Sequence, residues 1–148
     1  MNFEELMLRA VTNAETFKYT AKPNPVVGAI LCNDNEIISE GYHEIYGSNH
    51  AEINAISNAK KHQGKKFNNF SELALVCTLE PCSHVGKTGS CAEQIVEIGI
   101  KKVVIGSIDP NPKVAGKGIE ILKKNGIDVT VGIHEDIVKN QNKYFFFK

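Results

Sequence analysis

The order of hydrophobic and polar positions along the chain predicts alternating helices and strands. Apolar residues recur at helical spacing on one face of residues 3–17, which predicts a first helix. Apolar, β-branched runs at 25–33 and 36–43 flank a turn signal, so this pair is predicted to form a hairpin. The other predicted helices cover 50–61, 91–99, 116–126 and 134–147, and the other predicted strands cover 71–78, 101–108 and 127–133. Strands that alternate with helices indicate a layered α/β domain.

Length and composition narrow the class of protein. A chain of 148 residues that is 42% hydrophobic can bury a core of its own, so we expect one compact domain over residues 1–148. Basic and acidic residues number 17 each, and this balance argues against a nucleic-acid partner. The N-terminus lacks the pattern of a signal peptide, and no stretch approaches the roughly 18 apolar residues of a membrane span. We therefore expect a cytoplasmic protein with no membrane partner.

The stretch TLEPCSHVGKTGSCAE contains two of the four cysteines, Cys82 and Cys91. Such a pair can form a disulfide, bind a metal, supply a nucleophile or pack in the core. A reducing compartment disfavours the disulfide and favours metal binding or catalysis. Cys32 and Cys77 lie inside apolar runs instead, and we expect them to pack in the core.

Three candidate metal ligands lie at predicted junctions between elements. His50 opens a helix, Cys82 follows a strand, and Cys91 begins the next helix. Imidazole and thiolate are typical ligands of Zn²⁺, and three protein ligands leave a fourth position for water, as in catalytic sites. Glu52 can then act as a base and afterwards as an acid. The pattern H-x-E followed by P-C-x-x-C is typical of zinc nucleobase deaminases, and this chain departs from it only in a longer cysteine spacing.

Five strings point to a particular family: PNPVVGA, GYH, HAE, TLEPCSHVGKTGSC and DPNPKVAGKGI. In this order, and over nearly the whole chain, they resemble the deaminase domain of the bifunctional riboflavin-biosynthesis deaminase/reductase. The resemblance implies a three-layer α/β/α cytidine deaminase-like fold with a central mixed sheet of about five strands. It implies zinc-dependent hydrolysis of 2,5-diamino-6-(5-phospho-ribosylamino)pyrimidin-4(3H)-one to 5-amino-6-(5-phospho-ribosylamino)uracil and ammonia. By the same resemblance His50, Cys82 and Cys91 are the zinc ligands, and Glu52 is the proton shuttle.

The resemblance also implies contacts to a phosphorylated pyrimidine substrate. The residues concerned are Asn24, His43, His84, Lys87, Thr88, Asp109 and Asn111. A phosphate needs a cation and hydroxyl or backbone donors, which Lys87 and Thr88 can supply. Asp109 and Asn111 either close the wall of the pocket or shape a turn through the neighbouring prolines. Glu80 is expected to be structural and to hold backbone near the cysteines.

The chain departs from the family at two points. Gly89 and Ser90 stand where the family has a proline pair, so we expect a more flexible loop and an unchanged set of ligands. The sequence contains no reductase domain. Either the reductase is a separate chain, and then a candidate functional partner, or this domain is a piece of a longer protein; the sequence leaves both alternatives open. The family resemblance favours a homodimer or a higher homo-oligomer.

Two other functions remain open. A nucleoside or tRNA adenosine deaminase of the same fold is disfavoured by the neutral charge and by the loop suited to phosphate. A non-enzymatic, zinc-stabilised module predicts a closed site with four ligands, but no fourth Cys or His stands at suitable spacing. That module would also leave Glu52 without a role.

Overall fold

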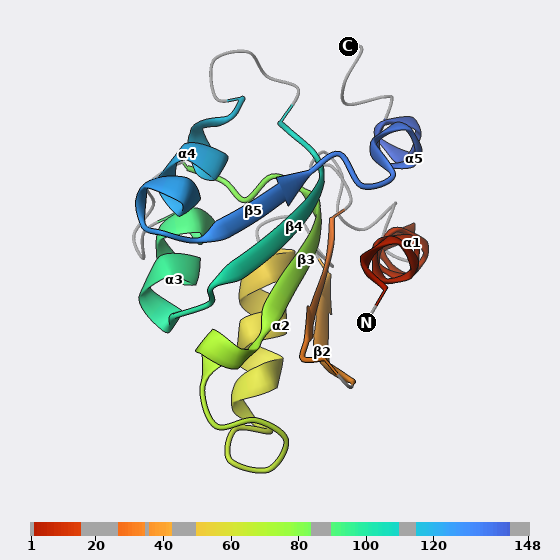
Figure 1. Ribbon diagram of the computed structural model, residues 1–148. Coiled ribbons are helices and arrows are strands. Elements are labelled where there is room, and N and C mark those ends of the chain that lie inside the picture. The colour runs from red at the N-terminus through yellow and green to blue at the C-terminus, as the bar shows by residue number, and fades with distance from the viewer. Residues whose placement is uncertain are drawn as a thin grey trace.

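The chain forms a five-stranded sheet with helices on both faces (Figure 1). The computed structural model describes residues 2–15, 27–34, 36–42, 50–83, 90–109 and 115–142. The strands are β1 (Gly28–Cys32), β2 (Ile37–Tyr42), β3 (Ala74–Leu79), β4 (Lys102–Ser107) and β5 (Asp128–Val131). The helices are α1 (Phe3–Ala14), α2 (Ala51–Lys60), α3 (Cys91–Ile98), α4 (Lys117–Lys124) and α5 (Glu135–Gln141), with a short 3₁₀ helix η2 (Phe70–Glu72). Among the described residues, no helix has both the length and the apolar character needed to cross a membrane.

The strand order is β2-β1-β3-β4-β5. Strand β1 runs antiparallel to both of its neighbours, whereas β3, β4 and β5 are parallel to one another. The predicted hairpin is therefore present, and the prediction of a mixed sheet of about five strands is confirmed.

The predicted and observed bounds differ by a few residues in most elements. The strand predicted over 71–78 begins only at Ala74, because the side chain of Asn69 accepts a hydrogen bond from the backbone of Ser71 and starts η2 instead. The helix predicted over 134–147 is described as α5, and the predicted residues 143–147 lie outside the described part of the chain.

Alternating side chains divide the core into two layers. One face of the sheet, which includes Leu31, Leu75 and Cys77, packs with side chains of α2, α3 and α4. The opposite face, which includes Cys32 and Val76, packs on α1, and Figure 1 shows α5 on that same side. Cys32 and Cys77 are 1% and 0% exposed, so the prediction that they pack in the core is confirmed.

Helix α2 lies directly on the edge strand β2. A Cβ atom at Gly41 would come within 2.3 Å of the backbone oxygen of Ala51, so only glycine permits this close approach. Two side chains of α2 also donate to carbonyl groups of β2: Asn54 to Tyr42 at 2.7 Å and Asn58 to Glu40 at 2.8 Å. These contacts fix the first turn of α2 at the edge of the sheet where β2 and β3 end.

Candidate metal centre and active site

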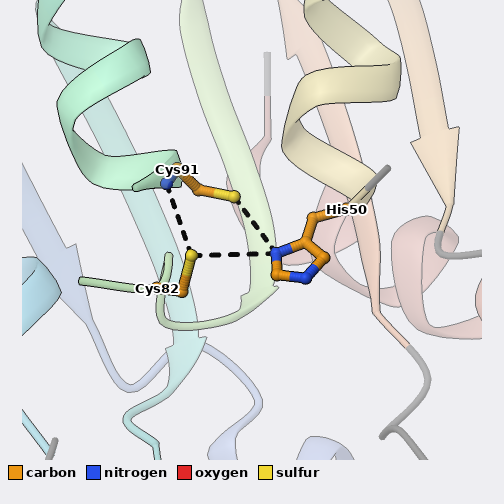
Figure 2. Close-up of side chains that lie close together, drawn as sticks. All are labelled: His50, Cys82 and Cys91. Atoms are coloured by element: carbon orange, nitrogen blue, oxygen red, sulfur yellow. Dashed lines mark hydrogen bonds between the residues drawn. The ribbon is translucent and has the colours of Figure 1, made fainter. Parts of the chain in front are cut away.

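Three potential metal ligands meet beyond the carboxyl end of β3 (Figure 2). His50 is the N-cap residue of α2, but its side chain makes no capping hydrogen bond and is directed toward the two cysteines. Cys82 follows β3, and Cys91 is the first residue of α3. The Nδ1 atom of His50 lies 3.2 Å from the Sγ atom of Cys91 and 3.7 Å from that of Cys82.

The spacing of these atoms fits a tetrahedral zinc ion. Metal–ligand distances of about 2.0–2.3 Å at tetrahedral angles place neighbouring ligand atoms about 3.5–3.8 Å apart. The three ligand atoms lie within 4.8 Å of one another, and the two nitrogen–sulfur distances lie close to the ideal range. In the described part of the chain, no fourth His, Cys, Asp or Glu joins the group. Three ligands would leave one position of a tetrahedral ion for a further ligand such as water.

The start of α3 surrounds Cys82 with hydrogen-bond donors. The backbone N–H of Cys91 donates to the Sγ atom of Cys82 at 3.3 Å, and the N–H of Ala92 donates to the carbonyl of Cys82 at 3.1 Å. The hydrogen bond from the Cys91 thiol, together with the donors from His50 and the backbone, lowers the pKa of Cys82 to about 4. Helix N-termini are known to stabilise thiolates in this way.

The two thiols do not ionise alike in the metal-free protein. The pKa of Cys91 is raised, chiefly because its thiol donates a hydrogen bond to Cys82 and also because it is buried. Before a metal binds, Cys82 is therefore the one cysteine of this pair that is deprotonated at neutral pH. A metal would have to displace the remaining proton, so metal affinity should fall at low pH.

Glu52 lies in the first turn of α2, next to the three candidate ligands. It is only 3% exposed, and its carboxylate interacts with the thiol of Cys91 and with the imidazole of His50. Burial raises the pKa of Glu52 to about 7. A carboxyl group with a pKa near neutrality can both accept and donate a proton, which is what a general acid–base residue requires.

The remaining predicted site residues are placed only in part. Asp109 is half-buried just beyond β4, and its backbone N–H donates to the side chain of Glu80 at 3.0 Å. Glu80 was expected to be structural, and the structure shows it binding backbone groups near the cysteines. The other predicted substrate contacts lie outside the described residues; these are Asn24, His43, His84, Lys87, Thr88 and Asn111.

The mixed sheet and the His/Cys/Cys group are together typical of zinc-binding deaminases. Residues 1–107 match the cytidine and deoxycytidylate deaminase zinc-binding region. The chain is 44% identical over 140 residues to the diaminohydroxyphosphoribosylamino-pyrimidine deaminase of Buchnera aphidicola subsp. Schizaphis graminum, covering 95% of this chain and 90% of the relative. It is also 44% identical over 147 residues to the protein of the same name from Buchnera aphidicola subsp. Acyrthosiphon pisum, covering 99% and 95%. The chain therefore belongs to the family of diaminohydroxyphosphoribosylamino-pyrimidine deaminases, as its motifs predicted.

A solved structure supports the same relationship. The diaminohydroxyphosphoribosylaminopyrimidine deaminase/5-amino-6-(5-phosphoribosylamino)uracil reductase of Thermotoga maritima superimposes with a TM-score of 0.87 at 43% identity. The match covers 97% of this chain but only 40% of the Thermotoga chain. The prediction of a cytidine deaminase-like α/β fold is confirmed by this agreement and by the mixed sheet.

Proposed function

We propose that the protein catalyses the hydrolytic deamination of 2,5-diamino-6-(5-phospho-ribosylamino)pyrimidin-4(3H)-one in riboflavin biosynthesis. The products are 5-amino-6-(5-phospho-ribosylamino)uracil and ammonia. The observation that carries the proposal is the buried carboxyl group of Glu52 beside the His/Cys/Cys group. The two Buchnera relatives, whose names state this deaminase activity, support the choice of substrate.

The donor set supports Zn²⁺ as the cofactor. His50 would bind it through Nδ1, and Cys82 and Cys91 would bind it through Sγ, because these are the atoms that converge. When bound, zinc would act as a Lewis acid and make a water molecule nucleophilic at neutral pH. Two thiolates and one imidazole are ligands that zinc prefers.

Glu52 would move the protons of the reaction. Its carboxylate accepts a proton from the attacking water and delivers it to the ring nitrogen next to the carbon that bears the amino group. A new C–O bond forms at that carbon. Glu52 then accepts the second proton of the added water and transfers it to the departing amine, so the C–N bond breaks and ammonia leaves. A pKa of about 7 suits both directions of transfer.

The substrate contacts remain predictions from the motifs. The amide of Asn24 and the imidazoles of His43 and His84 would contact the substrate, and Lys87 and Thr88 would bind its phosphate. Asp109 and Asn111 would form part of the wall of the pocket.

The organisation of the protein is also part of the proposal. We predict one zinc-dependent deaminase domain over residues 1–148, a homodimer or higher homo-oligomer, a location in the cytoplasm and a separate reductase as functional partner. Size-exclusion chromatography with light scattering tests the predicted oligomer, because a monomer at micromolar concentration would contradict it.

The test is a substrate panel run on the purified protein after its zinc content has been measured. We expect one zinc per chain, and ammonia release from the diaminopyrimidine but not from cytidine, deoxycytidylate or tRNA adenosine. Preferential release from a nucleoside or tRNA would favour the alternative deaminase. Bound zinc without ammonia from any compound would favour the non-enzymatic module.

A further inference from the structure

The side chain of Glu80 accepts hydrogen bonds from three backbone amides that lie far along the chain. Its Oε1 atom accepts from the N–H of Asp109 and from the N–H of Gly116, both at 3.0 Å. Its Oε2 atom accepts from the N–H of Ile119 at 3.1 Å. Glu80 is 8% exposed, so both oxygens are committed to backbone and are largely withdrawn from solvent.

Glu80 supplies a helix cap that α4 cannot make for itself. The N-cap residue of α4 is Gly116, at φ 82°, and it makes no side-chain capping bond. The N–H of Ile119 is one of the donors left without an intrahelical partner in the first turn, and the carboxylate of Glu80 satisfies it. A negative charge at this end of a helix also complements the helix dipole.

A second contact fastens α4 to the same short segment. A Cβ atom at Gly118 would lie 1.9 Å from the carbonyl oxygen of Pro81. Only glycine permits this approach, so the first turn of α4 rests on the peptide that precedes Cys82. The start of α3 holds Cys82 itself through two amide hydrogen bonds. Residues 80–82 are therefore clamped between the N-termini of two helices.

The Oε1 atom of Glu80 also joins two points of the connection from β4 to α4. Asp109 begins this connection and Gly116 ends it, and both donate to that one atom. Asp109 is one of the predicted substrate contacts. The position of its backbone relative to Cys82 is thus determined by a carboxylate two residues away from that candidate zinc ligand.

We propose that Glu80 is a positioning residue for substrate binding. It holds Asp109 and the start of α4 against residues 80–82 through hydrogen bonds to backbone amides rather than through a contact to substrate. This inference rests on the proposed function, since it concerns the wall of the same site.

Replacement of Glu80 by glutamine tests the inference with little change of shape. The amide group of Glu80→Gln places an NH₂ donor opposite at least one of the three backbone N–H groups and removes the charge. We expect KM for the diaminopyrimidine to rise about tenfold, which corresponds to about 1.4 kcal/mol of binding. We expect kcat to change less than about threefold, and zinc content to stay at the wild-type level, because the ligands and Glu52 are unchanged.

Two further variants make the experiment specific. Gly118→Ala loosens the contact between α4 and Pro81 from the opposite side and should raise KM in the same way. Glu97→Gln removes an exposed carboxylate on α3 and serves as the matched control, with kinetics like those of wild type. Melting temperatures of all three proteins establish that they are folded.

Amide chemical shifts supply a readout that does not depend on activity. Amide protons bound to a carboxylate resonate downfield, so those of Asp109, Gly116 and Ile119 should move upfield in Glu80→Gln and stay in place in Glu97→Gln. Unchanged chemical shifts of these three amide protons, or an unchanged KM in an active enzyme, would overturn the inference. A fall in kcat with loss of zinc would also overturn it, since Glu80 would then support the metal centre. A wild-type protein that releases no ammonia refutes the proposed function instead, and the amide shifts still decide whether the clamp exists.

Discussion

Replacement of Glu52 by glutamine separates a deaminase from a zinc-stabilised scaffold. The substitution exchanges one carboxylate oxygen for an NH₂ group and leaves the volume of the side chain almost unchanged. Glu52 is 3% exposed and lies outside the His/Cys/Cys group, so the Glu52→Gln protein should keep its fold and its zinc. The Glu52→Gln protein loses the carboxyl group, which can accept and donate a proton.

The size of the effect follows from the number of proton transfers. Burial brings the pKa of Glu52 to about 7, so both of its protonation states are accessible near neutral pH, and glutamine offers neither. One general acid–base step contributes typically about 10²–10⁴ to the rate. Since Glu52 would serve several transfers in one cycle, we expect kcat to fall by about 10⁴ or more, which is about 5.5 kcal/mol of barrier. Substrate affinity should stay within about tenfold, because the proposed phosphate contact at Lys87 is intact.

Zinc content, substrate affinity and ammonia release should be measured on one preparation of the mutant protein. Glu93→Gln, which alters an exposed carboxylate in the first turn of α3, is the control for the loss of one negative charge. A Glu52→Gln protein that retains zinc and turns over near the wild-type rate would refute the proton-transfer mechanism. Loss of zinc in this variant would show that Glu52 supports the metal centre rather than the chemistry.

Three further predictions follow from the site and the fold. Cys82→Ser or Cys91→Ser should lose zinc and lower the melting temperature together, because metal binding is coupled to folding; wild-type zinc content would remove that cysteine from the ligand set. Lys87→Ala should raise KM for the phosphorylated substrate by about 10–150-fold with little change in kcat, since a charge-assisted contact contributes about 1.5–3 kcal/mol. An equal loss on a substrate without the phosphate would contradict that assignment. Gly41→Ala should lower both stability and zinc affinity, because its Cβ would lie 2.3 Å from backbone atoms of α2, which follows a proposed ligand. Ser57→Ala, at an exposed position of α2, should change neither quantity.

Apolar, β-branched runs bounded by turn signals were sufficient to predict every described strand of the sheet. Neighbours such as Leu75 and Val76 face opposite layers but are both apolar, so these runs indicated buried strands without showing which layer each residue faces. The beginning of β3 was wrong by three residues for a local reason. The apolar run from Leu73 onward gives no sign that a side chain of the preceding turn, Asn69, binds backbone and starts a 3₁₀ helix.

The order of the strands and the details of the site depend on contacts between distant residues. The motifs predicted which three candidate ligands converge, because residue type and position in the elements were enough. They did not predict that one thiol of the pair keeps its proton, since this depends on the hydrogen bond between Cys91 and Cys82. Nor did they identify the partners of Glu80, which lie 29, 36 and 39 residues further along the chain.

The direction of the strands explains how the site accommodates anionic groups. Strand β1 alone is reversed, so β2, β3, β4 and β5 all end at one edge of the sheet. Helices α2, α3 and α4 follow β2, β3 and β4, so their N-termini lie at that edge, with N–H groups that lack intrahelical acceptors and with the positive ends of their dipoles. Such an edge stabilises negative groups through backbone N–H donors, and for Cys82 the side chain of His50 adds to this effect. The thiolate of Cys82 accepts a hydrogen bond from a backbone N–H of α3, and the carboxylate of Glu80 accepts one from a backbone N–H at the start of α4. A chain with no net charge can therefore hold the thiolate of Cys82 and the buried carboxylate of Glu80 close together. A cation such as zinc would add to the stabilisation that the backbone N–H groups provide.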